Sequence, residues 1–152
     1  MNFLNPFYTD KKKEISNKRK LYFLDFGLMN YYLDNFVYKS VYTGKDIEMF
    51  VFLQLLFNLD DFDNLYFYQT LNETEIDFIY KTNGKIIPIE VKSSNKDNIP
   101  KIFKFFCEKY FDQIKFMVKT NKWWLNERKE KYLIKFIPFL NVDEYIKDMI
   151  KA

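Results

Sequence analysis

An aspartate, a glutamate and a lysine in one predicted β-hairpin have the types and spacing for metal-assisted chemistry. Residues 74–94 read T-E-I-D-F-I-Y-K-T-N-G-K-I-I-P-I-E-V-K-S-S, two apolar-alternating runs joined by an Asn-Gly pair. Asn-Gly favours a two-residue type I′ turn, because both central residues need a positive φ. That turn fixes the strand register, places Asp77 directly opposite Glu90, and leaves Lys92 two residues further along the second strand.

The two faces of this hairpin are predicted to differ, because side chains alternate between the faces of a strand. One face is predicted to carry Glu75, Asp77, Ile79, Pro88, Glu90 and Lys92. The other is predicted to carry Ile76, Phe78, Tyr80, Ile87, Ile89 and Val91. The second set is wholly apolar or aromatic, so we expect it to form the core side of the strand pair.

Two carboxylates directly opposite each other repel, at a cost of up to about 1 kcal/mol on an exposed face. A divalent cation would offset that repulsion, and carboxylate oxygens are the ligands that Mg²⁺ prefers. Glu48 is the only acid in the helix predicted at residues 47–59, and Val51, Phe52 and Leu55 lie nearest to it on the helix surface. We therefore expect its carboxylate beside a core surface, where a third acid could complete a metal site.

An alternative interpretation of the same residues needs no metal. On a solvated hairpin face, Glu75 would pair with Lys92 while water screens the remaining charges. A glutamate in the first turn of a helix is likewise explained by the helix dipole alone. The hairpin by itself leaves both interpretations open.

The composition indicates one globular domain and excludes several kinds of active site. The chain has 152 residues, 48% of them hydrophobic and 30% charged, which suits a single domain with its own core. With one cysteine, Cys107, and no histidine, it cannot form a Cys/His zinc site or a Ser-His or Cys-His catalytic pair. Its three glycines cannot supply a Walker A loop or a dinucleotide-binding fingerprint. Any metal must therefore be held by oxygen ligands.

The sequence suggests neither a membrane span nor a secretory signal. The longest apolar run, residues 49–59, is interrupted by Gln54 and Asn58, and it is shorter than the roughly 20 residues that a bilayer requires. The start, M-N-F-L-N-P-F-Y, lacks the charged and apolar regions of a signal peptide. We therefore expect a cytoplasmic protein that does not insert into membranes.

The predicted elements surround the hairpin with helices. Residues 1–20 are polar and basic, and we expect them to be a poorly structured lead-in or linker before a domain at 21–152. Strands are predicted at 21–25, 65–70, in the hairpin, at 113–118 and at 132–138, and helices at 28–34, at 47–59 with Asp46 as N-cap, after Pro100, and at 142–150. This order predicts an α/β (α+β) fold with a mixed central sheet and helices on both faces.

The charge is distributed unevenly along the chain. Residues 21–80 contain ten acids and two lysines, whereas residues 81–135 contain fourteen bases and six acids. Such a division could place a basic surface beside an acidic site, which would suit a polyanion such as DNA held for metal chemistry. The alternative is that the two halves neutralise each other across the fold.

Several segments together resemble a known group of proteins. Glu48 on a helix, followed by Asp77 and by Glu90-Val91-Lys92 on paired strands, resembles the PD-(D/E)xK nucleases of the restriction-endonuclease-like superfamily. Four segments are similar to the C-terminal domain of unknown function of prokaryotic AAA-type ATPases: P-F-Y-T-D-K-K-K-E-I, K-L-Y-F-L-D-F-G-L-M-N, E-I-D-F-I-Y and G-K-I-I-P-I-E-V-K-S-S. The resemblance implies a restriction-endonuclease-like core and a possible ATPase module or protein partner.

The resemblance also implies a role for each site residue. Asp77 and Glu90 would hold one or two Mg²⁺ (or Mn²⁺) ions, joined by the carbonyl of Val91. Lys92 would orient or help to deprotonate the attacking water and stabilise charge on the phosphate. Glu48 would support the metal or its water. The implied reaction is hydrolysis of DNA phosphodiester bonds.

Two further functions fit the same sequence. The domain could be a non-catalytic partner-binding or assembly module of an AAA-type ATPase that retains the nuclease fold. It could also bind nucleic acid through its lysine-rich region without cleaving it, in which case affinity would fall steeply with salt and survive loss of Glu90.

Overall fold

The computed structural model describes residues 2–8, 19–34, 42–59, 62–70, 74–93, 98–110, 115–119, 126–129 and 133–151. Its elements, in chain order, are β1 (Asn2–Pro6), β2 (Lys20–Tyr22), α2 (Phe26–Tyr32), α3 (Gly44–Asn58), η1 (Phe62–Asn64), β3 (Leu65–Gln69), β4 (Glu75–Thr82), β5 (Lys85–Lys92), α4 (Lys101–Lys109), β6 (Lys115–Lys119), β7 (Asn126–Lys129), β8 (Leu133–Pro138), η2 (Phe139–Asn141) and α5 (Val142–Lys151).

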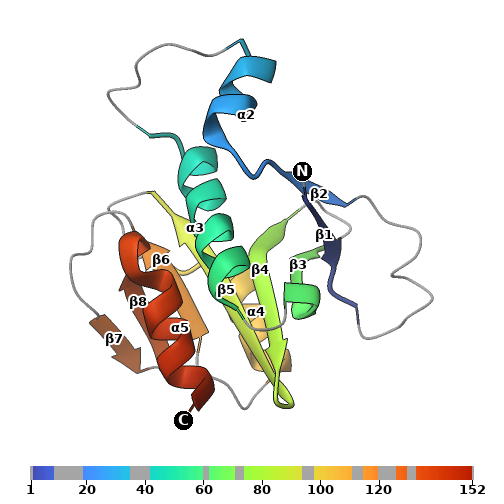
Figure 1. Ribbon diagram of the computed structural model, residues 1–152. Coiled ribbons are helices and arrows are strands. Elements are labelled where there is room, and N and C mark those ends of the chain that lie inside the picture. The colour runs from blue at the N-terminus through green and yellow to red at the C-terminus, as the bar shows by residue number, and fades with distance from the viewer. Residues whose placement is uncertain are drawn as a thin grey trace.

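Within these residues, the strands form one mixed sheet in the order β2-β1-β3-β4-β5-β6-β8-β7. β3, β4 and β5 are antiparallel, whereas β5, β6 and β8 run parallel. Helices α3 and α5 cover one face and α4 covers the other (Figure 1). The predicted mixed sheet with helices on both faces is therefore confirmed.

Each face of the sheet has its own buried core. Phe52 and Leu55 of α3 and Ile146 of α5 belong to one cluster, whereas Phe103 and Phe106 of α4 belong to the other. The predicted core side of the hairpin is confirmed for five residues of the first cluster, Phe78, Tyr80, Ile87, Ile89 and Val91, and the other face of the sheet is also buried, under α4. In the described part of the chain, no helix is long and apolar enough to cross a bilayer.

Helix α3 begins earlier than predicted because of a capping box. Thr43 is the N-cap: its Oγ1 accepts from the Asp46 amide at 3.3 Å, while Asp46 Oδ2 accepts from the Thr43 amide at 2.8 Å. Asp46 thus occupies the third helical position and not the N-cap. The earlier start places Glu48 in the second turn of α3, with Asp46 as the acid of the first turn, so the helix dipole alone does not account for Glu48.

The hairpin between β4 and β5 has the predicted register. Asn83 and Gly84 have φ values of 47° and 73°, as a type I′ turn requires. Cα partners run from Thr82↔Lys85 to Phe78↔Ile89, without a shift. The start of β4 and the end of β5 therefore lie together, at the opposite end of the sheet from the turn.

Replacing Gly84 with alanine tests how far this turn stabilises the hairpin. No atom lies within 4 Å of an added Cβ, so the cost is the positive φ alone. We expect Gly84→Ala to lower the free energy of unfolding by about 1 kcal/mol, measured by urea denaturation. Gly44→Ala, at a helical position with only an ordinary contact of 3.7 Å to Ser93 Oγ, should not destabilise the protein.

A β-bulge changes the predicted faces of β4. The register moves from Tyr66↔Ile79 to Tyr68↔Ile76, so one residue of β3 faces two residues of β4, Asp77 and Phe78. Ile76 consequently packs with Ile79 in the core under α4 and not with Phe78, contrary to the prediction. Bulges reorient side chains in this way and are common beside active sites.

The N-terminal segment is not a poorly structured lead-in where the structure describes it. Asn2–Pro6 forms β1, parallel to β3, and Leu4 and Phe7 are buried. Phe7 makes edge contacts with the rings of Tyr66, Phe106 and Tyr110. The basic residues of this segment led us to predict no strand, although its apolar residues are sufficient to form one. Residues 9–18 lie outside the described part, and the boundary of the domain remains a prediction.

Candidate functional site

The predicted site residues lie at the end of the sheet opposite the β4–β5 turn. Glu48 lies on α3, Asp77 on β4, and Glu90 and Lys92 on β5. The start of α3 lies far from that turn (Figure 1), and Glu48 contacts Lys20 and Tyr22 of β2. Asp77 and Glu90 are buried, whereas the Lys92 side chain is 39% exposed. The fold therefore gathers all four residues in one region.

Asp77 and Glu90 replace part of the strand ladder with side-chain hydrogen bonds. Beyond Phe78↔Ile89, the amide of Val91 donates to Asp77 Oδ2 at 2.8 Å. The Asp77 backbone in turn hydrogen-bonds the Glu90 carboxylate. These bonds link the two acids beyond the end of the ladder at Phe78↔Ile89, which does not include the predicted direct pairing of Asp77 with Glu90.

Glu90 has one paired and one unpaired oxygen. Its Oε1 lies 2.6 Å from Lys92 Nζ. Its Oε2 is buried and has no hydrogen-bond partner among the described residues. Since a buried, unsatisfied charged group is costly, this oxygen marks a position where a cation would be favourable.

Lys20 is a site residue that the sequence did not reveal. Its Nζ lies 3.0 Å from Glu48 Oε1, 3.0 Å from Glu75 Oε1 and 3.9 Å from Asp77 Oδ1. Glu75 therefore pairs with Lys20, and the alternative pairing with Lys92 is not found. The side chain of Lys20 is only 20% exposed, so three carboxylates surround a largely buried amine.

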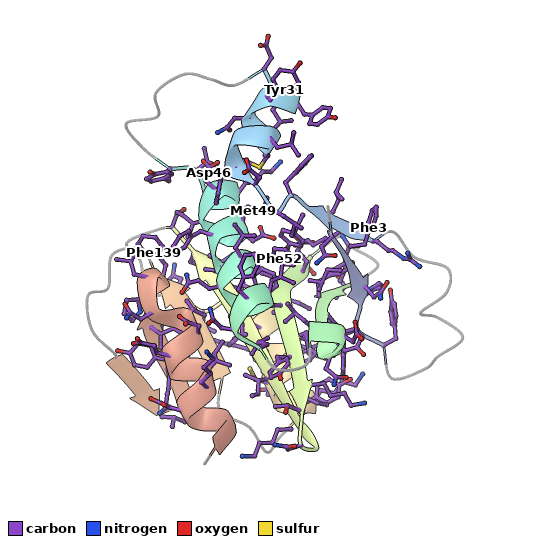
Figure 2. All side chains as sticks on the ribbon, viewed as in Figure 1. Phe3, Tyr31, Asp46, Met49, Phe52 and Phe139 are labelled. Atoms are coloured by element: carbon purple, nitrogen blue, oxygen red, sulfur yellow. The ribbon has the colours of Figure 1, made fainter. Side chains whose placement is uncertain are left out.

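Tyr22, two residues along β2, completes this group. Its hydroxyl donates to Glu48 Oε1 at 2.6 Å, and its ring stacks on Phe52 with centroids 4.1 Å apart. Phe52, labelled on α3 in Figure 2, thereby supports the ring that positions Glu48. The spacing of Lys20 and Tyr22 in K-L-Y could have indicated that they act together, because residues two apart on a strand share a face.

The charges of the site shift the pKa values of its members. Burial raises the pKa of Asp77 well above its ordinary value, and the charges of Glu90 and Glu48 raise it further. Burial also raises the pKa of Glu90, although Lys92 opposes the rise. For Lys20, burial disfavours the charged amine, but Glu48, Asp77 and Glu75 outweigh it and raise the pKa. The site is thus crowded with negative charge that its two amines only partly balance.

Tyr22→Phe tests the link between β2 and Glu48. The substitution keeps the ring on Phe52 but removes the hydrogen bond to a carboxylate, so we expect the free energy of unfolding to fall by roughly 1.5 kcal/mol. Chemical denaturation of the two proteins measures the difference. Tyr32→Phe, at a ring that is 64% exposed, should change stability little. Equal effects of the two substitutions would contradict a specific role for the Tyr22 hydroxyl.

The described residues contain no group of three or more acidic, cysteine or histidine side chains arranged to hold a metal ion. Asp77 and Glu90 form a pair, and Lys20 lies between the other carboxylates and Asp77. Any cation here would therefore rely on two side-chain carboxylates, with the Val91 carbonyl as a possible third ligand.

Comparison with known proteins places the chain in a family. Residues 43–145 match the model described as "Domain of unknown function (DUF4143)", a range that includes Glu48, Asp77, Glu90 and Lys92 but not Lys20 or Tyr22. No significant match was found among curated proteins. Since the matched range covers more than half of the 152 residues, the chain belongs to the DUF4143 family, whose domains are typically found at the C-terminus of AAA-type ATPases.

Proposed function

We propose that this domain is a Mg²⁺- or Mn²⁺-dependent nuclease-like phosphodiesterase that hydrolyses DNA and has a PD-(D/E)xK core. The observation that carries the proposal is the Oε2 of Glu90, an acidic oxygen buried without a hydrogen-bond partner among the described residues. It lies beside Asp77, whose backbone hydrogen-bonds the same carboxylate. Such oxygens are the ligands that hard divalent cations prefer.

The net charge of the region that includes this oxygen suits a divalent ion. Four carboxylates and two amines form the site, which gives a net charge of −2 when all are ionised: Glu48, Glu75, Asp77 and Glu90 with Lys20 and Lys92. Asp77, Glu90 and the carbonyl of Val91 would hold the ion, and Glu48 would support it or its water. The charge of one Mg²⁺ would neutralise the site.

Lys92 is placed to act on a substrate. A bound ion would neutralise the scissile phosphate and lower the pKa of an attacking water. Lys92 Nζ lies 2.6 Å from Glu90 Oε1, yet its side chain is 39% exposed, so the amine reaches both a metal ligand and the solvent. There it would orient the attacking water and stabilise the charge that develops on the phosphate.

The arrangement of the neighbouring strands also favours a polyanionic substrate. The register of β5 and β6 makes Lys92 and Lys119 Cα partners. A lysine is therefore the last residue of each of these two adjacent parallel strands, at the same edge of the sheet. Lysines contribute to DNA affinity through contacts with phosphate, which weaken as salt rises. We infer that DNA would approach the site from this edge.

Cleavage assays test the proposed function. The purified protein should cut plasmid, single-stranded or branched DNA with Mg²⁺ or Mn²⁺ and should not cut it in EDTA. Glu90→Gln should lose the activity, whereas Glu108→Gln, the same substitution at an exposed position of α4, should retain it. Absence of metal-dependent cleavage by the parent protein on all three substrates would reject the nuclease function.

A second candidate is a non-catalytic partner-binding module of an AAA-type ATPase, which α2 favours. None of the residues of α2 is buried, and Leu28 and Tyr31 are exposed. Tyr31 extends from α2 away from the sheet (Figure 2), and exposed apolar side chains of this kind are typical of protein interfaces. Titration with Mn²⁺ distinguishes the two functions, because a module without catalysis has no need to bind the ion.

A further inference from the structure

The Lys20 amine occupies a position that resembles a cation site. Three carboxylate oxygens lie around it, two of them at 3.0 Å. The ring of Phe67 lies beneath the amine, with its centroid 5.7 Å from Nζ. The amine is therefore held by fixed groups from β3, β4 and α3, and is not a mobile surface charge.

Asp77 divides the site into two parts. Its Oδ1 faces Lys20 at 3.9 Å, while its Oδ2 accepts from the Val91 amide. On the other side lies Glu90, whose Oε2 has no partner in the described part of the chain. One part of the site thus already contains a cation, the amine of Lys20. The other part contains Glu90 Oε2, which has no hydrogen-bond partner among the described residues.

We propose that Lys20 takes the place of a second metal ion, so that the site holds a single divalent cation between Asp77 and Glu90. This inference rests on the proposed metal-dependent function. Two-metal phosphodiesterases place their ions about 4 Å apart on shared carboxylates, and Lys20 lies against the carboxylate that the two parts share.

The charge of the site supports one ion and not two. With four carboxylates and two amines, one divalent cation brings the net charge to zero. A second would leave two uncompensated positive charges in a largely buried region. Loss of the Lys20 charge changes this balance and leaves Glu48, Glu75 and Asp77 without their shared partner.

Counting bound Mn²⁺ ions by titration calorimetry tests the inference on the full chain. The parent protein should bind one ion, and Lys20→Met, which removes the amine but keeps most of the length of the side chain, should bind two. Lys20→Arg keeps the charge and should bind one. Lys81→Met, at an exposed position near the β4–β5 turn, should also bind one.

The outcomes separate this inference from the proposed function. If the parent binds two ions, or if Lys20→Met binds only one, the role of Lys20 is wrong while the metal-dependent function stands. If neither protein binds Mn²⁺, both proposals fail. Circular dichroism confirms that Lys20→Met is folded, and Lys20→Gln, which also removes the charge and should also bind two ions, is counted in its place should Lys20→Met not fold.

Discussion

Glu90→Gln is expected to stabilise the protein without metal and to abolish its stabilisation by metal. The Glu90 carboxylate is buried, with one oxygen unpaired among the described residues. Because burial raises its pKa, ionising this side chain at neutral pH costs folding free energy. A neutral amide removes that cost, and Lys92 remains solvated because its side chain is 39% exposed. We expect a gain of about 1 kcal/mol in EDTA.

In the presence of metal, the parent protein should be more stable than Glu90→Gln, which is the reverse of their order in EDTA. A ligand that binds only the folded state stabilises it by about 2.7 kcal/mol at 100 times its dissociation constant. The parent protein should gain this stability in Mn²⁺, whereas Glu90→Gln should gain little, and its DNA cleavage should fall by roughly 100-fold or more. Thermal unfolding in EDTA and in Mn²⁺ measures both effects.

Two results would contradict this expectation. Glu108→Gln should show the behaviour of the parent protein under both conditions, so a matching change there would indicate a general charge effect. If Glu90→Gln unfolds below the parent protein in EDTA, the pairing of Glu90 with Lys92 contributes more than the cost of burying the charge, and the unpaired oxygen is not evidence of a missing cation.

Phe52→Ala is expected to cause the largest loss of stability. Phe52 is 0% exposed, stacks on Tyr22 at 4.1 Å and lies 6.4 Å from the ring of Phe78. Removing a buried phenylalanine costs about 3–5 kcal/mol, since the cavity adds to the lost burial. For a chain of this size we expect the melting temperature to fall by roughly 10 °C.

Phe57 offers a matched control on the same helix. Its side chain is 73% exposed, so Phe57→Ala should change stability by no more than about 0.5 kcal/mol. Phe52→Ala should also weaken the effect of Tyr22→Phe, because Tyr22 loses the ring that holds its hydroxyl against Glu48. Additive effects in the double variant would show that the packing of Phe52 and the position of Glu48 are independent.

Local features of the sequence were sufficient to predict the hairpin and its two acids. The turn at Asn83 and Gly84 depends on φ values that those residues adopt readily, and the turn then sets every pair back to Phe78↔Ile89. The approximate positions of α3, β3, β8 and α5 follow from equally local signals, namely apolar periodicity and residues that start or end helices.

The sequence by itself thus determined that Asp77 and Glu90 meet at one end of a strand pair. Only the tertiary structure decided which amine joins them. Lys20 and Glu48 are 28 residues apart, and nothing in the sequence selects Lys20 from the 24 basic residues. The bulge opposite Phe67 and the pairing of β1 with β3 are also absent from local patterns. The physical reason is that turn and helix signals depend on neighbouring residues, whereas contacts between distant strands depend on how the whole sheet packs and buries its faces.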